Sequence, residues 1–451
     1  MAPRDELHQT DGDHGESPTR RAFSGAPPAL IEEMSGNRSE MVFRSCFLLM
    51  VLLPGMPARA ADWPMWRCDA GHTGATSASL PRALSLAWSR QYPRRVPVWE
   101  DALNQDMMPY DAVLEPVVAG GRMFLGMNDS DKVVALDART GEELWRFYAD
   151  GPVRLPPAVV GENVFFTSDD GHLYGVAAAD GQLRWRFRGG PSARKALGVG
   201  RLISAWPARG GPVVRDGTIY FGASIWPLMG TFIHALDATT GNSLWLNDST
   251  GADFIKQPHG APAFAGVAPQ GVLTIAGDAL LVPGGRSCPA VFDRRSGAPR
   301  YFFFGAKGQG GSFVAADARR FFVHTRGRGT TAFALADGKE LKFSINEPVL
   351  DGATAYAANT PGAASDGRAA PPVVQAFGPD NRVLWQVEAD GTGDLIKAGD
   401  RLYAAGKQAI TAIDLPREGR PARVAWSLPV DGRVRRLLAG CDMLFAVTDD
   451  G

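Results

Sequence analysis

Side chains with oxygen atoms that could hold a hard cation gather at one place in the sequence. Asn128, Asp129 and Asp131 fall within four residues, and amide and carboxylate oxygens are the ligands that Ca²⁺ prefers. Asn-Asp-Ser-Asp between two strand-like segments is also typical of a turn. We favour the turn and expect no metal site there.

The histidines and possible nucleophiles predict no catalytic centre. No Ser, His and Asp set can be assembled from the spacing, and the glycine-rich stretch 305–311 lacks the Lys-Ser/Thr ending of a phosphate loop. Five histidines that follow residue 60 are isolated in the sequence and have no metal-ligand spacing. We expect each to be a turn or surface residue: His72, His172, His234, His259 and His324.

The composition favours a protein of many short strands. The chain has 47 Lys and Arg against 48 Asp and Glu, a net charge of -1, so no global attraction to nucleic acid is expected. It also has 53 Gly, 33 Pro and 11 Trp. This mixture is expected where tight turns separate short strands, which indicates an all-β fold.

The N-terminal sixty residues predict an export signal. Residues 1–40 are polar and aperiodic, and we expect them to be disordered or an overlong extension. Residues 41–60 have a basic residue, a short apolar stretch and a small-residue run, the pattern of a cleaved signal peptide. The apolar stretch is shorter than a membrane span requires, so we expect no transmembrane segment and a periplasmic or secreted protein.

An internal repeat organises the rest of the chain, residues 61–451. The stretch from Ala135 to Trp145 (ALDARTGEELW) returns as Ala235 to Trp245 (ALDATTGNSLW), and five weaker copies follow the same plan. The shorter intervals between copies are about 40 residues, the length of a propeller blade of four strands. Asp137 and Asp237 can bond the backbone of the turn, and Gly141, Gly181 and Gly241 supply its positive φ.

The motif tryptophans are expected to be structural, each filling the wedge between neighbouring blades while its N–H meets a backbone carbonyl. They are Trp145, Trp185, Trp245, Trp385 and Trp426. Leu84 to Arg90 resembles an outer strand without its predecessors, and the chain ends after two inner strands. Joining them predicts an eight-bladed β-propeller of four-stranded antiparallel blades, with a last blade that is closed by the N-terminal strand and incomplete in a chain cut from a longer polypeptide.

Three cysteines remain after the expected cleavage, an odd number that cannot form a full disulfide framework. Cys68 and Cys441 could close the ring with a disulfide, or both could be buried free thiols, as could Cys288. No Cys-x-x-Cys-His sequence is present to attach a haem.

The Ala-x-Asp-x-x-Thr-Gly-x-x-x-Trp unit at Ala135 and Ala235 resembles the tryptophan-docking repeat of the pyrroloquinoline-quinone (PQQ) quinoprotein and BamB-like propeller family. The dehydrogenase branch implies PQQ and Ca²⁺ on the axis, commonly beneath a disulfide of adjacent cysteines, and this chain has no Cys-Cys pair. The BamB-like branch implies a non-catalytic platform without a cofactor. We therefore predict a binding or scaffolding module, with a PQQ-dependent dehydrogenase as the alternative.

Strand alternation predicts that the long connections emerge on one face, from residues 94–111, 189–210, 247–271 and 346–370. A protein or glycan partner is expected on this face, because aromatic and basic side chains suit anionic or polar partners; the alternative is that the loops merely cap the ring. The candidate residues are Trp99, Tyr110, Lys195, Arg201, Trp206, Trp226, Lys256, His259, Arg286, Arg326 and Arg328.

Overall fold

A computed structural model of the chain describes residues 62–95, 97–98, 108–256, 260–284, 287–303, 309–326, 328–359 and 371–451. The predicted extension 1–40 and signal peptide 41–60 lie outside the described residues. The described part of the chain is all-β, and its one helical element is a single 3₁₀ turn, η1, at Pro227–Met229.

Seven antiparallel sheets, each built on four consecutive strands, follow one another along the described chain. The first three sheets contain β2 (Val117–Ala119), β3 (Arg122–Met127), β4 (Lys132–Asp137), β5 (Glu143–Tyr148); β6 (Ala158–Val160), β7 (Asn163–Thr167), β8 (His172–Ala177), β9 (Leu183–Arg188); and β12 (Gly210–Arg215), β13 (Thr218–Ala223), β14 (Phe232–Asp237), β15 (Ser243–Asn247). The next two contain β19 (Thr274–Ala276), β20 (Ala279–Gly284), β21 (Ser287–Asp293), β22 (Pro299–Tyr301); and β23 (Gln309–Ala316), β24 (Arg320–Thr325), β25 (Gly329–Ala334), β26 (Glu340–Ile345). The last two contain β27 (Val349–Asp351), β28 (Thr354–Asn359), β29 (Val373–Phe377), β30 (Val383–Glu388); and β31 (Asp394–Ala398), β32 (Arg401–Ala405), β33 (Ala409–Asp414), β34 (Arg423–Pro429).

The remaining strands extend these sheets or form smaller ones. β18 (Gly271–Val272) adds in parallel to β12, and β1 (Ala75–Thr76) adds in parallel to β31. Three two-stranded sheets contain β10 (Lys195–Gly198) with β11 (Arg201–Ser204), β16 (Phe254–Lys256) with β17 (Pro262–Phe264), and β35 (Val434–Gly440) with β36 (Met443–Thr448).

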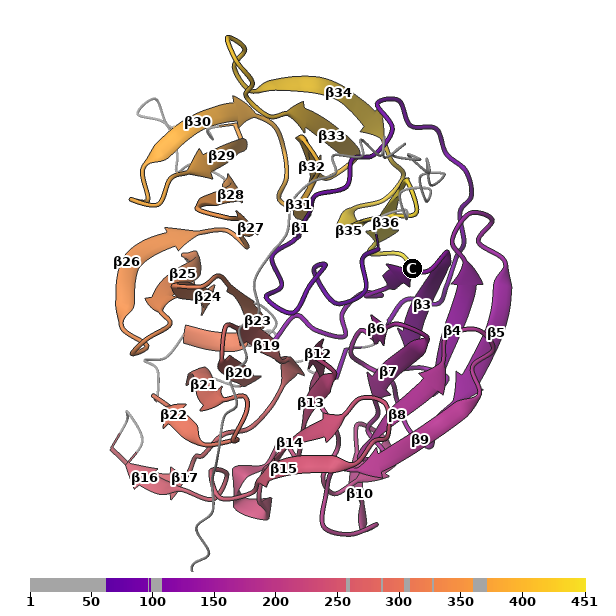
Figure 1. Ribbon diagram of the computed structural model, residues 1–451, viewed down its shortest axis with the longest axis vertical. Coiled ribbons are helices and arrows are strands. Elements are labelled where there is room, and N and C mark those ends of the chain that lie inside the picture. Colours follow the sequence, from indigo (N-terminus) through magenta and orange to yellow (C-terminus); the bar gives the residue numbers. More distant parts are fainter. Residues whose placement is uncertain are drawn as a thin grey trace, which may run out of the picture. The chain divides into compact units, whose positions relative to one another are not determined.

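The four-stranded sheets are the blades of a β-propeller. Figure 1 shows them around a common centre, each with its first strand innermost and its fourth strand at the rim. Inner strands such as β3 and β7 are almost wholly buried, whereas β5 and β9 alternate between exposed and covered positions. The difference arises because inner strands have a neighbouring sheet on both faces, while the outer strand has an edge in water.

The repeat motif joins consecutive blades. The Asp137 carboxylate accepts the N–H groups of Arg139 and Thr140, at 2.8 and 2.9 Å, and so holds the turn that the sequence predicted. Trp145 donates its indole N–H to the Ala178 carbonyl of the next blade at 3.0 Å, and its ring covers Gly181. The rings of Trp185 and Trp245 cover Gly241 and Gly297 in the same way. The motif glycine therefore provides both a positive φ and the space for a tryptophan.

Residues 84–90 form no strand, although the sequence predicted an outer strand there, because no described strand lies beside them to supply backbone partners. Trp88 nevertheless takes the position of a motif tryptophan. Its N–H donates to the Ala138 carbonyl at 3.1 Å, and its ring covers Gly141. Its ring centre lies 5.9 Å from that of Phe445 on β36, as Trp145 lies 5.8 Å from Phe124 on β3.

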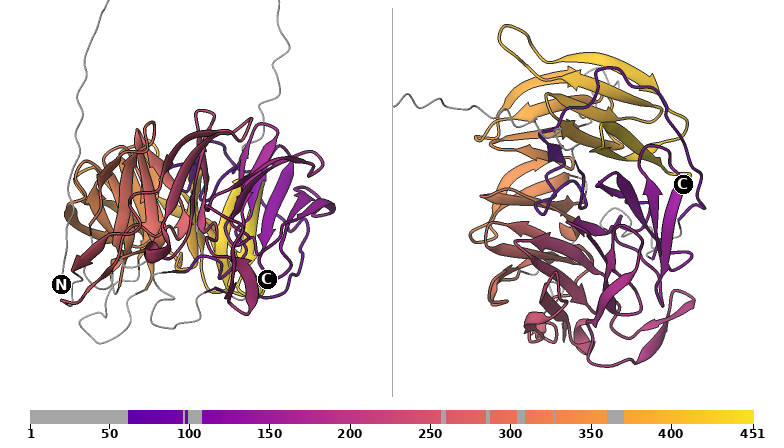
Figure 2. Two further views of the ribbon diagram at one scale, coloured as in Figure 1. Left: turned by 90° about the horizontal axis from the view of Figure 1, so that it is seen from below. Right: turned by 45° about the vertical axis from the view of Figure 1, so that its right-hand side comes forward.

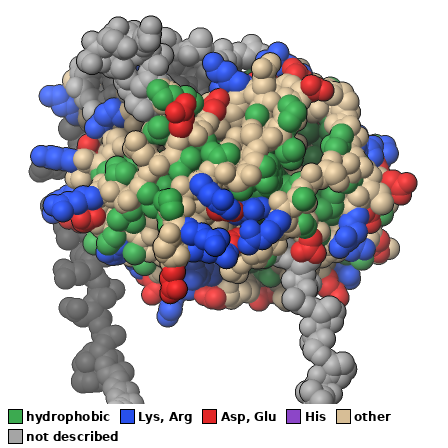
Figure 3. Space-filling view, turned by 90° about the horizontal axis from the view of Figure 1, so that it is seen from above, with side chains coloured by type: hydrophobic (Ala, Val, Ile, Leu, Met, Phe, Trp, Pro, Cys, Tyr) green, Lys and Arg blue, Asp and Glu red, His purple; other side chains and the backbone are tan. Residues whose placement is uncertain are grey.

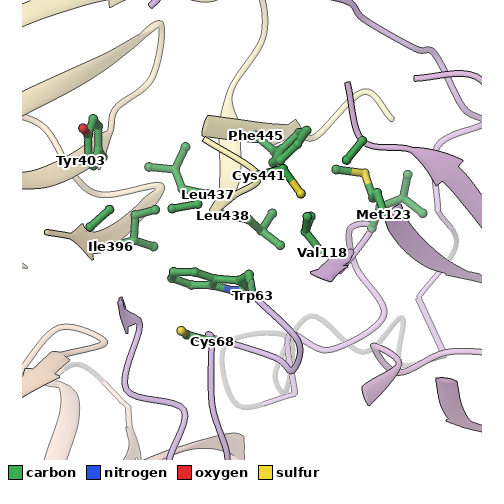
Figure 4. Close-up of a cluster of buried hydrophobic side chains, with 14 of the residues drawn as sticks. Trp63, Cys68, Val118, Met123, Ile396, Tyr403, Leu437, Leu438, Cys441 and Phe445 are labelled. Carbon is green, nitrogen blue, oxygen red and sulfur yellow. The ribbon is translucent and has the colours of Figure 1, made fainter. Parts of the chain in front are cut away.

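One apolar cluster joins the beginning of the ring to its end. Figure 4 shows Trp63 among side chains of β2 and β3, from the first blade, of β31, from the seventh blade, and of the two-stranded sheet β35–β36. Cys68 and Cys441 both belong to this cluster and are free thiols, as is the buried Cys288. Burial raises the pKa of each of these thiols. The disulfide that the sequence left open is not formed.

Candidate functional site

The axis of the propeller is lined by a segment of the chain itself, residues 62–76. Carbonyl groups of this segment accept backbone N–H groups from the innermost strands of six blades, β2, β6, β19, β23, β27 and β31. The donor and acceptor pairs are Val118 to Trp63, Val159 to Pro64, Ile275 to Ala70, Ala316 to Gly71, Leu350 to Thr73 and Lys397 to Gly74, at 2.7–2.9 Å. The sequence did not predict the axial position of residues 62–76, because the segment is irregular and its partners are spread over the whole chain.

A buried network of charges fills the axis beside this segment. Asp111 pairs with Arg95 at 2.7 Å and with Arg154 at 2.6 Å, and Asp169 pairs with Arg154 at 2.7 Å and with Arg209 at 2.8 Å. Each of these side chains is at most 5% exposed. Burial acts to raise the pKa of Asp169, but the charges and hydrogen bonds of Arg209 and Arg154 outweigh it, so its pKa lies below the usual value.

Further carboxylates on the axis also have partners. Glu115 accepts hydrogen bonds from Arg436 at 2.8 Å and from the indole of Trp66 at 3.0 Å. Asp394 pairs with Arg67 at 3.4 Å and accepts the backbone N–H of Leu437 at 2.8 Å. The carboxylates of Asp111, Asp169, Glu115 and Asp394 are therefore neutralised by arginines of the chain itself.

The described axial residues do not fit a quinone with Ca²⁺. A cavity beside the network, lined by Glu347, Asp394, Arg433, Arg435 and other residues, has a volume of about 110 Å³, whereas pockets for drug-sized ligands have about 300 Å³ or more. Asp111, Asp169, Glu115 and Asp394 are already paired with arginines, and Glu347 is paired with His324. No group of three His, Cys, Asp or Glu side chains among the described residues could hold a metal ion.

The turn expected at Asn128 to Asp131 is present between β3 and β4. Asn128 donates a side-chain hydrogen bond to Asp111, and Asp131, at φ 54°, forms an ion pair with Arg201. The amide nitrogen of Asn128 and one carboxylate oxygen of Asp131 thus serve contacts within the protein.

Three of the histidines are buried: His72, His234 and His324. The expectation of a turn or surface position is wrong for His234 and His324, which lie in β14 and β24, whereas His72 ends a turn in which its N–H donates to the Asp69 carbonyl. The ring of His72 contacts the Val314 carbonyl at 2.8 Å, and burial lowers its pKa to about 3. Burial likewise lowers the pKa of His234 to about 4. These two rings are neutral at physiological pH and act as polar core residues.

One face of the propeller carries the connections from strand four to the next strand one, together with the turns from strand two to strand three. Figure 2 shows the blades from the side, with strands running between two faces. Two of the predicted long loops contain hairpins, β10–β11 in 189–210 and β16–β17 in 247–271. The prediction of a long loop over 346–370 is wrong, because β27 and β28 occupy 349–351 and 354–359.

The structure separates the candidate residues of this face into groups. Trp99, His259 and Arg286 lie outside the described residues. Tyr110 and Trp206 are buried, so they do not face a partner as expected. The reason is that residues 108–115 enter the axis, where the Tyr110 hydroxyl donates to Gln270 at 3.2 Å, while Trp206 packs against Gly190 and donates to Met229 at 2.8 Å.

The remaining candidates reach the surface. Trp226 is 49% exposed, and Lys195, Lys256, Arg326 and Arg328 are exposed. Arg328 pairs with Glu340 at 3.1 Å. Arg201, paired with Asp131, is partly covered. Burial could not be predicted here because it depends on how each loop folds back on the ring.

The family model described as "Outer membrane protein assembly factor BamB" matches residues 93–338, more than half of the chain. The chain belongs to this BamB-like family. Within the described residues, no helix has the length and apolar character needed to cross a membrane.

Two solved structures are similar to this chain at low identity. A europium-containing methanol dehydrogenase is 13% identical, with a TM-score of 0.54 over 83% of this chain and 86% of that one. BamB from Moraxella catarrhalis is 18% identical, with a TM-score of 0.43 over 64% of this chain and 79% of that one. The likeness to the methanol dehydrogenase shows the fold alone.

Among curated proteins, the serine/threonine-protein kinase AfsK of Streptomyces griseus is 31% identical over 137 residues, 29% of this chain. The match spans 15% of the length of that kinase.

Proposed function

We propose that this chain is a periplasmic or secreted, non-catalytic propeller that binds a protein partner through the face of its long connections. The main support for the proposal is the set of residues that lies on the axis. The position where a cofactor or small substrate would lie holds the chain's own residues 62–76 and the Asp111–Asp169 network, while the connections β10–β11 and β16–β17 project outward. Membership of a family described as a protein assembly factor favours protein over glycan as the partner.

The proposal includes eight blades. The position of Trp88, over Gly141 and against Phe445, supports an eighth blade built from β35, β36 and the segment 84–90. Export rests on the predicted signal peptide 41–60 and on the family. Fractionation of cells that express the tagged full chain tests it, and retention of the uncleaved chain in the cytoplasm would contradict it.

Site-specific photo-cross-linking tests the binding face. A photoreactive amino acid at Trp226 or Arg328, both exposed on turns from strand two to strand three, should yield discrete adducts in the native host. Glu162 and Arg319 are exposed on turns from strand one to strand two, on the opposite face, and provide matched controls. Adducts only at the two control positions would overturn the choice of face, and no adducts at any position would overturn the binding function.

The alternative function is a PQQ-dependent dehydrogenase. Calorimetric titration of the purified protein with PQQ and Ca²⁺, followed by an assay with an artificial electron acceptor, separates the two. We expect no saturable heat and no reduction of the acceptor. Binding near one equivalent would require residues 62–76 or the charge network to move off the axis, and would overturn the proposal.

A further inference from the structure

Three neighbouring elements of the long-connection face expose large apolar side chains. The hairpin β10–β11 exposes Leu197 by 80% and Leu202 by 61%, and the hairpin β16–β17 exposes Phe254 by 62% and Phe264 by 52%. The 3₁₀ turn between β13 and β14 carries the third apolar group. We refer to this set as the apolar crest: Leu197, Leu202, Trp226, Leu228, Phe254 and Phe264.

Hydrogen bonds hold the bases of the three elements together. Trp206, directly after β11, donates its indole N–H to the Met229 carbonyl of η1 at 2.8 Å. Thr231, two residues after η1, donates its hydroxyl to the Val267 carbonyl, beyond β17, at 2.7 Å. In Figure 1, the hairpins β10–β11 and β16–β17 lie at the same edge of the ring, on either side of β14 and β15. The three elements that carry the crest are therefore joined at their bases around one blade.

The apolar side chains of the hairpins are paired across the strands and turned away from the ring. Leu197 lies opposite Leu202 in the β10–β11 register, and Phe254 lies opposite Phe264, with ring centres 5.1 Å apart. Ile203, the neighbour of Leu202 on the other face, is buried. Each hairpin thus presents apolar side chains to water, which is unusual for a two-stranded sheet that must hold its own register, while Ile203 is buried and Ile255 and Ala263 are half-buried on the other face.

The rim of the propeller differs from the crest. Figure 3 shows apolar side chains interspersed with Lys, Arg, Asp and Glu on the side of the ring where β34 lies. Exposed residues there, such as Val383 and Leu384, belong to outer strands of four-stranded sheets. Their strands are supported from within, so their exposure needs no partner to explain it.

Charges beside the crest indicate the chemistry of its partner. Arg194 and Lys195 are exposed at the base of β10 and have no ion pair within the described part of the chain, and Lys256 on β16 has none either. Asp248 and Asp253 are exposed near the second hairpin. The β10–β11 end of the crest is therefore the cationic end, and it favours carboxylates beside the apolar groups of a ligand.

The backbone of β10 favours a polypeptide over a lipid surface. Within the described chain β10 pairs only with β11, so its outer edge presents free N–H and C=O groups. An added peptide strand would satisfy these groups, whereas hydrocarbon would leave them without partners. We propose that the apolar crest binds an extended protein segment with alternating apolar and acidic residues, which adds to the β10 edge. This inference rests on the proposed binding function and names the partner's chemistry.

A synthetic peptide provides the probe. We suggest a labelled twelve-residue peptide with Leu or Phe alternating with Glu, titrated with the full protein and followed by fluorescence anisotropy. Replacing Leu197 and Leu202 with Ser should weaken binding by about tenfold or more, because two exposed leucines would no longer be covered. The matched control replaces Val383 and Leu384, which are 50% and 58% exposed on β30, with Ser and should leave affinity unchanged.

Further measurements test the role of the basic residues and the chemical class of the ligand. Replacing Arg194 and Lys195 with Glu should weaken binding and reduce its dependence on salt. Three results would overturn the inference. The first is equal peptide affinity of the two Ser double variants, and the second is equal binding of a peptide with Lys in place of Glu. The third is binding of phosphatidylglycerol vesicles without binding of the peptide. Photo-cross-links at Arg328 but none at Leu197 or Phe264 would overturn it while the proposed function stands.

Discussion

Gly181→Ala separates two demands that the repeat motif makes on one glycine. Gly181 has φ 74°, and a Cβ there would lie 2.6 Å from the ring of Trp145. Gly161, in a turn of the same blade, has φ 58° but nothing within 4 Å of its would-be Cβ. Gly161→Ala therefore measures the backbone cost alone, and Gly181→Ala measures that cost plus the clash.

The magnitudes follow from these two geometries. An L-residue at positive φ costs about 1–2 kcal/mol, and forcing an extra methyl group into a packed contact costs about 1–3 kcal/mol more. We expect the free energy of unfolding to fall by about 1–2 kcal/mol for Gly161→Ala and by about 2–5 kcal/mol for Gly181→Ala. The difference, about 1–3 kcal/mol, is the contribution of the Trp145 contact.

Urea unfolding, followed by far-ultraviolet circular dichroism with tryptophan fluorescence as a second probe, measures both losses. A double-mutant cycle completes the test, since in a Trp145→Leu background Gly181→Ala should cost little more than Gly161→Ala. Equal losses for the two alanine variants in the native background would refute the reasoning, because the tryptophan would then contribute nothing to the requirement for glycine.

Three further predictions concern polar groups. Trp145→Phe removes the hydrogen bond to the Ala178 carbonyl and should lower the free energy of unfolding by about 1 kcal/mol in urea; an unchanged midpoint would contradict it. Asp169→Asn leaves the Arg209 charge buried without its carboxylate, and should lower the free energy of unfolding by about 3–5 kcal/mol in the same assay. A loss below about 1 kcal/mol would mean that water reaches Arg209 and solvates its charge. Burial acts to raise the pKa of Glu347, but the hydrogen bond and charge of its histidine partner lower it to about 2. The ionised Glu347 therefore contributes its full stabilisation above its ordinary pKa of 4.5, and this stabilisation is lost as pH falls toward 2. The difference in free energy of unfolding between wild type and Glu347→Gln should shrink over that pH interval in an acid titration.

Most of the fold could be predicted from the repeat in the sequence. Asp137, Gly141 and Trp145 recur because each blade needs the same tight turn and the same tryptophan contact with its neighbour. Such local requirements leave a periodic trace that can be read without coordinates. The all-β class and the BamB-like resemblance both followed from that trace.

The candidate site did not leave such a trace. Residues 62–76 contact six blades through backbone carbonyls, which any amino acid supplies, so their place on the axis is invisible in the sequence. Tyr110 and Trp206 read as surface residues because they fall in long connections, and only the folding of those connections buries them. Leu197 and Phe264 fall in connections that the sequence predicted only as long loops, and the hairpins β10–β11 and β16–β17 leave these side chains in water. Local turn chemistry is encoded residue by residue, whereas burial and exposure depend on which distant segments meet, and the tertiary structure alone decides that.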